Sequence, residues 1–382
     1  MWNSIYYEGN SWRHTHLLQE AFKRSGQSTL QLEANESGRE KLYKSFLREV
    51  VLPHSHRITS LLLDITRATF EDLLLLPSGL FDELECIKIH ISSTYEYSSM
   101  PQATVFQGAP QLRRVTIPLS NNHSPLDLAL PWDQLTYLAL TPNFMELTDS
   151  FKVLSLCTNL SECHFCLCPD PEPPTVVPPA SIQLPHLRKL RINMSRKSVY
   201  ANYFRPLAIP NLEQFAFVLS DPSDDHLKDL IETIGRLSIP DLRLVLYYDG
   251  YGMDGLLRLA HSLPPLTSIK VCEYFLPTSM LELIAQDACF QTLTSLEAGI
   301  RRYNPKDLVE KFKLTVYWTR ARQSNNVHAG IHSVMVEVVG TSHKVTSDFS
   351  RDIAVIQKRL GASDAKITLR RRRPHLGRSW LF

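Results

Sequence analysis

The chain has 382 residues and a formal net charge of +2, so its overall charge gives no reason to expect binding to nucleic acid or to an anionic membrane. No apolar run approaches the roughly 20 residues of a membrane-spanning helix, and Met1 is followed by neither a basic nor an apolar stretch, which argues against a secretion signal. Because the seven cysteines are odd in number and lie mostly in or beside expected strands, we expect a reducing compartment, cytoplasmic or nuclear.

Residues 1–55 are predicted to form an N-terminal cap and the first divergent repeats. Trp2–Tyr7 and Ser28–Glu33 have the composition of strands, and the amphipathic stretch His14–Arg24 between them predicts a helix that ends before a glycine. A second helix is expected over Ser37–Val51.

Residues 56–304 carry ten apolar triplets in which the first residue is followed by the second after three positions and by the third after five. Successive triplets begin 26, 28, 23, 25, 27, 25, 30, 24 and 27 residues apart. This period is typical of leucine-rich repeats. The triplets are Ile58/Leu61/Leu63, Leu84/Ile87/Ile89, Leu112/Val115/Ile117, Leu135/Leu138/Leu140, Leu160/Cys163/Phe165, Leu187/Leu190/Ile192, Leu212/Phe215/Phe217, Leu242/Val245/Tyr247, Leu266/Ile269/Val271 and Leu293/Leu296/Ala298.

Side-chain alternation explains the pattern. If the first triplet residue is position 1, positions 4 and 6 of a short strand enter the core, and positions 3, 5 and 7 face outward. Position 9 of the first seven units is Thr, Ser, Asn or Cys, which bond backbone groups in a turn. Stacked units bury a continuous core. The predicted fold is therefore α/β: a leucine-rich-repeat solenoid with a curved parallel sheet and helices on its convex side.

Helical spacing between the triplets marks the convex side. It is clearest over Leu227–Leu237, recurs after Asp254 and after Pro277-Thr278, and is weaker over Asp149–Leu156.

Residues 305–382 are predicted to be a C-terminal capping segment. Leu314, Val316 and Trp318 alternate, as do Val334, Val336 and Val338, while Ser347–Leu360 has helical spacing. Arg370–Arg373 is expected in a basic tail, as a nuclear-import or acidic-surface contact or simply as a solvated run.

Several segments resemble the region that follows the F-box in fungal F-box/leucine-rich-repeat proteins. They are the start Trp2-Asn-Ser-Ile with its helix and Ser28-Thr-Leu-Gln-Leu, His54-Ser-His-Arg-Ile-Thr-Ser-Leu, Ala109-Pro-Gln-Leu-Arg-Arg-Val, and Leu130-Pro-Trp-Asp-Gln-Leu-Thr-Tyr-Leu. The resemblance implies that the repeats hold a protein to be ubiquitinated. It implies an adaptor of a cullin-type ubiquitin ligase as a second partner only if an F-box lies upstream, since none precedes Trp2 in this sequence.

Two motifs suggest ligand chemistry but have structural explanations. Gly250-Tyr-Gly-Met-Asp-Gly255 matches a dinucleotide-binding fingerprint, yet a leucine-rich repeat supplies the same strand, turn and helix, and Asp249 and Asp254 would repel a pyrophosphate. Cys163-His164-Phe-Cys166-Leu-Cys168 looks like a metal cluster, but no second cysteine or histidine pair accompanies it. We therefore predict no cofactor and no metal.

Other polar motifs also favour structural roles. Asp224-Asp225-His226 suits a helix start, where acidic side chains complement the dipole. Pro169–Pro179 is read as an exposed insertion, with polyproline recognition as the alternative. No nucleophile elbow, P-loop or zinc-protease motif occurs, so we expect no catalytic residue and no enzyme.

The concave strand face is the candidate binding surface, because a broad, rigid arc contacts a partner along many repeats at little entropic cost. Basic side chains outnumber acidic ones on it, which suggests a protein partner with an acidic patch. The predicted partner-binding residues are Lys88, His90, Arg114, Tyr137, Glu162, His164, Lys189, Arg191, Gln214, Tyr248 and Lys270, with Thr116 and Glu297 beside them.

Two functional classes agree with these patterns. The first is the substrate-recognition part of an F-box protein in a cullin-type ubiquitin ligase. The second is a stand-alone leucine-rich-repeat scaffold or inhibitor with no ligase link. A nucleotide-dependent enzyme is a distant third.

Overall fold

A computed structural model describes residues 4–8, 13–35, 47–91, 103–118, 124–168, 181–194, 203–204, 206–219, 231–232, 234–235, 243–248, 268–273, 295–300, 333–339 and 366–372. The helical elements are α1 (Arg13–Arg24), η1 (Leu47–Val51), η2 (Leu52–Arg57), α3 (Arg67–Leu74), η3 (Pro125–Asp127), η4 (Trp132–Gln134) and α4 (Leu147–Leu156). The strands are β1 (Ser4–Glu8), β2 (Leu30–Asn35), β3 (Ile58–Ile65), β4 (Cys86–Ile91), β5 (Arg114–Ile117), β6 (Tyr137–Glu146), β7 (Glu162–Cys168), β8 (Ile182–Gln183), β9 (Lys189–Met194), β10 (Leu207–Ala208), β11 (Gln214–Leu219), β12 (Arg243–Tyr248), β13 (Ser268–Glu273), β14 (Ser295–Ile300), β15 (Ser333–Val339) and β16 (Lys366–Arg372).

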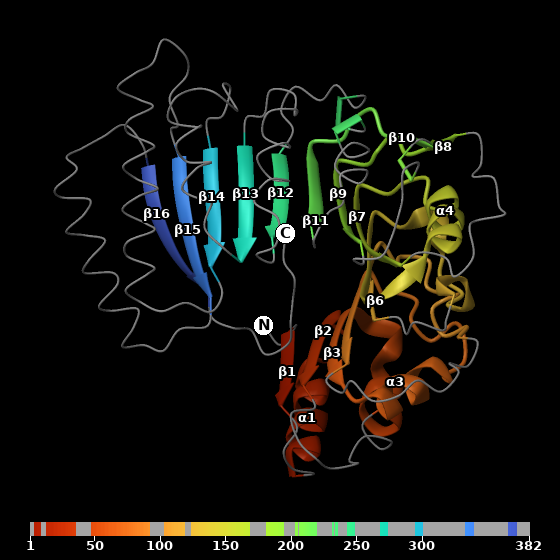
Figure 1. The fold of residues 1–382 in the computed structure, drawn as a ribbon. Coiled ribbons are helices and arrows are strands. Elements are labelled where there is room, and N and C mark those ends of the chain that lie inside the picture. The colour runs from red at the N-terminus through yellow and green to blue at the C-terminus, as the bar shows by residue number, and fades with distance from the viewer. Residues whose placement is uncertain are drawn as a thin grey trace. The chain divides into compact units, whose positions relative to one another are not determined.

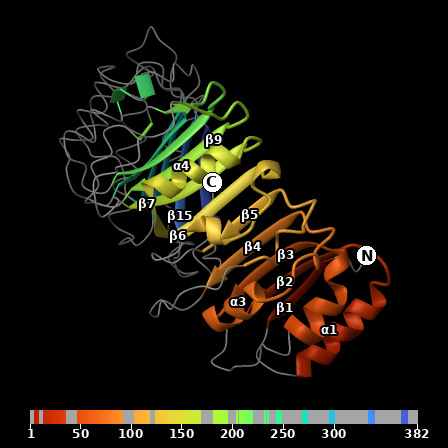
Figure 2. The ribbon, with the colours of Figure 1, turned by 90° about the vertical axis from the view of Figure 1, so that its right-hand side faces the viewer.

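The chain divides into two units, residues 1–187 with 206–209, and residues 188–205 with 210–382. This division does not coincide with the predicted boundaries at 55 and 304. In the large sheet, the strands of the first unit follow the order β1 to β7, and those of the second follow β9, β11, β12, β13, β14, β15 and β16 (Figure 1 and Figure 2). In the first unit, β8 and β10 pair with each other in a separate two-stranded sheet. The pairings given for these strands within each unit are parallel. The class is therefore α/β with a large parallel sheet, as the sequence predicts.

In the first unit, positions 4 and 6 form continuous buried rows. The predicted N-terminal strands join these rows, because Ile5 pairs with Leu32, which pairs with Leu61. Full burial of such a side chain stabilises the fold by about 1.5–3 kcal/mol relative to its exposure. The position-4 row consists of Ile5, Leu32, Leu61, Ile87, Val115, Leu138 and Cys163, each at most 6% exposed.

A backbone hydrogen bond recurs from repeat to repeat just before each strand. The position-2 N–H donates to the position-2 carbonyl of the preceding repeat, so adjacent repeats are joined in the same way each time. The bonds run from Glu85 to Thr59 (2.9 Å), Arg113 to Glu85 (2.9 Å), Thr136 to Arg113 (2.9 Å) and Ser161 to Thr136 (2.8 Å), and in the second unit from Glu213 to Arg188 (2.8 Å).

Helices cover the core side of the first unit. Figure 2 shows α1 and α3 on one side of β1 to β4, and α4 contacts β6 and β7. The sequence predicts α1 and α4 correctly within a few residues, but α3 is not predicted. Thr66, at position 9, caps the N-terminus of α3, since its hydroxyl accepts from the backbone N–H of Thr69 at 3.4 Å. At the corresponding place Asn143 lies inside β6 instead of in a turn.

The eighth triplet, Leu242/Val245/Tyr247, is wrong by one residue. Leu244 and Leu246 pair with the core positions of β11 and β13, whereas Val245 pairs with Lys270. The segment Arg243–Tyr248 has apolar residues at five successive positions, so alternation gives no way to detect a one-residue slip.

Near the C-terminus the sheet continues through β15 and β16. The predicted strand at Val334, Val336 and Val338 is confirmed as β15. Of the predicted basic run, Arg370–Arg372 lie in β16, and Arg370 is the register partner of Glu337 on β15.

Other predictions are tested only in part or fall outside the described residues. Two fragments of Leu227–Leu237 are described, 231–232 and 234–235, and both are helical. The second predicted N-terminal helix is described only at its end, as η1. The strand at 314–318, the helix at 347–360 and the helices after Asp254 and Pro277 lie outside the described residues.

Candidate functional site

The candidate site is the face of β1 to β7 opposite the core, called the outer face below. It consists of the position-3 and position-5 side chains, which alternate with the buried rows. The position-3 row is Ser4, Gln31, Ser60, Cys86, Arg114, Tyr137 and Glu162. The position-5 row is Tyr6, Glu33, Leu62, Lys88, Thr116, Ala139 and His164.

Exposure changes along the outer face. From β1 to β5 its side chains are exposed or half-buried, and Tyr6 keeps 58% of its surface in solvent. At β6 and β7 the position-5 side chains are buried, with Ala139 at 2% and His164 at 4%. The accessible part of the outer face therefore extends from β1 to β5, together with Tyr137 and Glu162 of the position-3 row.

A charged and aromatic cluster occupies the β4–β6 part of the outer face. The guanidinium carbon of Arg114 lies 4.6 Å from the centre of the Tyr137 ring, a cation–π geometry. Burial raises the pKa of Tyr137 above its ordinary value, and the hydrogen bond with Thr116 and the charge of Arg114 only partly oppose this effect. The phenol is therefore neutral at physiological pH and presents a hydroxyl rather than an anion to Arg114.

Cys86 lies beside Arg114 in the same row. Burial raises the pKa of its thiol, and the nearby charges of Arg114 and Lys88 reduce but do not cancel this effect. The thiol is thus protonated at neutral pH and leaves both cations uncompensated.

Asp64 and His90 form a pair at position 7 of β3 and β4. His90 Nδ1 lies 3.0 Å from Asp64 Oδ1, and the two residues are register partners. Asp64 is therefore already engaged by its neighbour on the next strand.

The structure distributes the predicted partner-binding residues unevenly. Lys88, His90, Arg114, Tyr137 and Glu162 share the first unit, where Arg114 is exposed and the other four are half-buried. In the second unit Lys189 and Gln214 are half-buried register partners.

For four of the predicted partner-binding residues the structure gives a different placement or describes only the backbone. His164 and Arg191 are buried, at 4% and 2% exposure, so neither presents an open surface. Tyr248 is the register partner of Leu219, and it lies two residues after Leu246 and four after Leu244, in the same alternating set. The sequence placed Tyr248 outward because the eighth triplet was shifted by one residue. Lys270 is described as the register partner of Val245 and Glu297.

Sequence reasoning missed Tyr6, Glu33 and Leu62, which extend the outer face toward the N-terminus. The signal was present, since Ile5 and Tyr7 are buried and flank an exposed Tyr6. The register of β1 on β2 and of β2 on β3 is needed to place these three residues in the same row as Lys88.

The cysteines near β7 have the properties of core residues. Burial raises the pKa of Cys157 to about 12 and that of Cys163 well above its ordinary value. Among the described residues, no three His, Cys, Asp or Glu side chains gather as metal ligands would.

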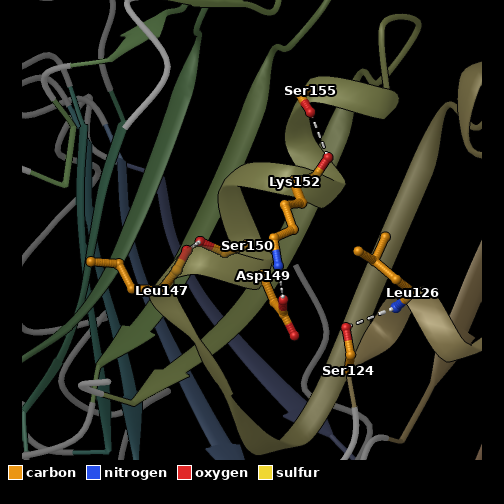
Figure 3. A network of polar contacts seen from close by, with 7 residues as sticks. All are labelled: Ser124, Leu126, Leu147, Asp149, Ser150, Lys152 and Ser155. Carbon is orange, nitrogen blue, oxygen red and sulfur yellow. Dashed lines mark hydrogen bonds and ion pairs between the residues drawn. The ribbon is translucent and has the colours of Figure 1, made fainter. Parts of the chain in front are cut away.

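Polar contacts around α4 are explained by local structure. Ser150 and Ser155 donate to the carbonyls of Leu147 (2.6 Å) and Lys152 (2.7 Å), and Lys152 pairs with Asp149 at 3.1 Å (Figure 3). All are contacts within one helix. The glycine-rich segment 250–255, Asp224–His226 and the proline-rich segment 169–179 lie outside the described residues.

Comparisons of the chain with protein-family models and with curated proteins find no match. In the part of the chain that the structure describes, no helix has both the length and the apolar character needed to cross a membrane.

Proposed function

We propose that the chain is a leucine-rich-repeat solenoid that binds another protein through its outer face. Support for the repeat assignment comes from the period of about 26 residues, the parallel register of positions 4 and 6, and the recurring position-2 hydrogen bond.

The accessible outer face from β1 to β5 is the observation that carries the binding proposal. It combines an exposed Tyr6, a half-buried Leu62 and the Arg114–Tyr137 pair. Tyr and Arg, together with Trp, are enriched at the energetic centres of protein interfaces. Because parallel strands of a sheet hold these residues, binding would cost little ordering entropy.

The resemblance to F-box/leucine-rich-repeat proteins supports a narrower role. In this role the chain holds the substrate of a cullin-type ubiquitin ligase, and a linked F-box contacts the adaptor. A free-standing scaffold or inhibitor would use the same surface without the ligase.

Affinity purification followed by mass spectrometry tests the binding proposal. The tagged full-length protein from its native locus is compared with a Tyr6→Arg/Leu62→Arg variant, which places two guanidinium groups on the outer face. We expect recovery of the principal partners to fall at least about tenfold, a loss typical of changes at an interface centre.

A matched control is Leu17→Arg/Leu75→Arg. These leucines are 65% and 66% exposed and lie in α1 and just after α3, away from the outer face. Equal partner recovery by the outer-face variant and wild type would contradict the binding proposal. A cullin adaptor among the partners favours the ligase role, and its absence favours the scaffold.

A further inference from the structure

Lys88 and Arg114 are two cations of the outer face that have no carboxylate partner among the described residues. In the described part of the first unit, ion pairs join Lys23 to Glu20, Arg67 to Glu71 and Lys152 to Asp149, and His90 contacts Asp64.

The two cations lie on adjacent strands and act on the same group. Arg114 pairs with Cys86 in the register of β4 and β5, and Lys88 follows Cys86 by two residues on the same strand face. Both charges influence the Cys86 thiol. The Tyr137 ring holds the guanidinium of Arg114, so this cation loses less rotamer freedom on binding than a free arginine would.

We propose that the outer face binds an extended acidic segment of the partner protein, with carboxylates at Lys88 and Arg114 and an apolar side chain on Tyr6 and Leu62. This inference depends on the proposed function and names the chemistry that the same surface recognises. A carboxylate suits the site because Arg114 offers a planar fork of donors and Lys88 a second positive charge, with neither already neutralised.

The strand spacing sets the distance between the two recognised groups. Lys88 on β4 and Tyr6 on β1 belong to one row, three strand intervals apart. At about 4.8 Å per interval this distance is roughly 14 Å, which an extended chain covers in about four residues. The expected segment therefore has an acidic residue about four positions from a large apolar one.

Glu33 makes the arrangement directional. It is exposed between Tyr6 and Leu62 in the same row, so it repels a carboxylate at the β1–β3 end of the outer face. Acidic residues of the partner should accordingly lie over β4 and β5 only.

Selection from a phage-displayed library of random twelve-residue peptides tests the inference. The bait is the immobilised full chain, as wild type, as Lys88→Glu/Arg114→Glu, and as the control Lys23→Glu/Lys152→Glu. The control makes the same charge change at exposed residues of α1 and α4, where surface ion pairs contribute little to stability. Circular dichroism verifies that all three proteins are folded.

For the wild type and the control we expect enrichment of Asp or Glu about four residues from Leu, Ile, Phe, Tyr or Trp. A synthetic peptide with the enriched sequence should bind the Lys88→Glu/Arg114→Glu protein at least about tenfold more weakly, and its affinity for wild type should fall as salt rises.

Enrichment without acidic residues, equal binding by the charge-reversed protein, or recovery of no peptide by folded wild type would each overturn the inference. Neutral peptides whose binding is lost in Tyr6→Arg/Leu62→Arg would leave the proposed function standing while the acidic segment fails. Failure of the proposed function itself is detected separately, by the purification experiment with native partners.

Discussion

Arg57 joins the end of α1 to the start of the repeats. Its side chain is only 6% exposed and donates to Ser25 Oγ at 2.9 Å, to the Phe22 carbonyl at 2.9 Å and to the carbonyl of Gly26. The last carbonyls of a helix lack intrahelical partners and carry partial negative charge, so a buried cation is well placed there. His54 stacks on Phe22, with ring centres 4.4 Å apart, and burial lowers the pKa of His54.

We predict that Arg57→Met lowers the free energy of unfolding by about 3 kcal/mol or more, because several buried acceptors lose their donor. Arg57→Lys should be intermediate, since one ammonium group does not reproduce the fork of the guanidinium. Urea denaturation of the purified chain measures both effects.

Arg48→Met is the control for Arg57, because Arg48 is exposed in η1 and should change stability by less than about 0.5 kcal/mol. If Arg57→Met and Arg48→Met have the same unfolding midpoint, the proposed role of Arg57 is wrong.

The burial of some individual residues could not be predicted from the sequence. Alternation placed His164 and Arg191 on the strand face away from the triplets, yet both are buried. Periodicity identifies the face of a strand on which a side chain lies, but it carries no information on what covers that face. Arg57 has no periodic signal at all, since its hydrogen-bond acceptors, the Ser25 hydroxyl and several backbone carbonyls, lie about thirty residues earlier in the chain.

Among the elements, the loops before β4 and β5 pack closely because of two glycines. A Cβ on Gly108 would lie 2.9 Å from the backbone N and 3.0 Å from the Cα of Gly79. Gly79 itself has a φ of 75°, in the left-handed region that favours glycine. Adjacent repeats therefore approach each other backbone to backbone at this point.

We predict that Gly108→Ala lowers the free energy of unfolding by about 1–3 kcal/mol, since backbone atoms cannot move aside as a flexible side chain would. The measurement is thermal or urea denaturation of the purified variant.

Gly235→Ala provides the comparison. No atom lies within 4 Å of a Cβ added to Gly235, and Gly235 is helical. The substitution should therefore leave the free energy of unfolding unchanged or raise it by up to about 1 kcal/mol. A Gly108→Ala protein as stable as wild type would contradict the close approach.

At this scale the sequence predicts strands better than helices. Strands recur about every 26 residues, so most of the predicted strands lie within two residues of the observed ones. The exception at β12 arose where Leu244–Tyr248 is uniformly apolar. The helix α3 was missed because the residues from Phe70 to Leu76 do not show a clear helical period, although Thr66 offers a start signal.

Over the whole molecule, the proposed repeat architecture predicts that stability is local. In the described part of the first unit, β1 to β7 lie side by side in chain order. If the proposed solenoid is correct, stability approximates a sum of repeat and interface contributions.

We predict that Leu138→Ala, in the buried position-4 row, reduces hydrogen-exchange protection of β5, β6 and β7 far more than that of β2. Leu138 is fully buried, between Val115 and Cys163 in register, and such a truncation costs about 2–5 kcal/mol. Hydrogen exchange read by mass spectrometry gives the protection of each strand.

Gln31→Ala, at an exposed position of β2, is the control and should leave protection unchanged throughout. A uniform loss of protection across β2 to β7 in Leu138→Ala would identify a single cooperative core and would count against the solenoid.

The recurring position-2 hydrogen bond has an evolutionary consequence. Since Thr59, Glu85, Arg113 and Thr136 each offer the same carbonyl to the following unit, this main-chain contact does not depend on which side chains the neighbouring units carry. In-frame duplication of a gene segment of roughly 26 codons would therefore lengthen the protein while leaving the older repeats intact. Under the proposed repeat architecture, such duplications would change the binding surface in steps of one repeat.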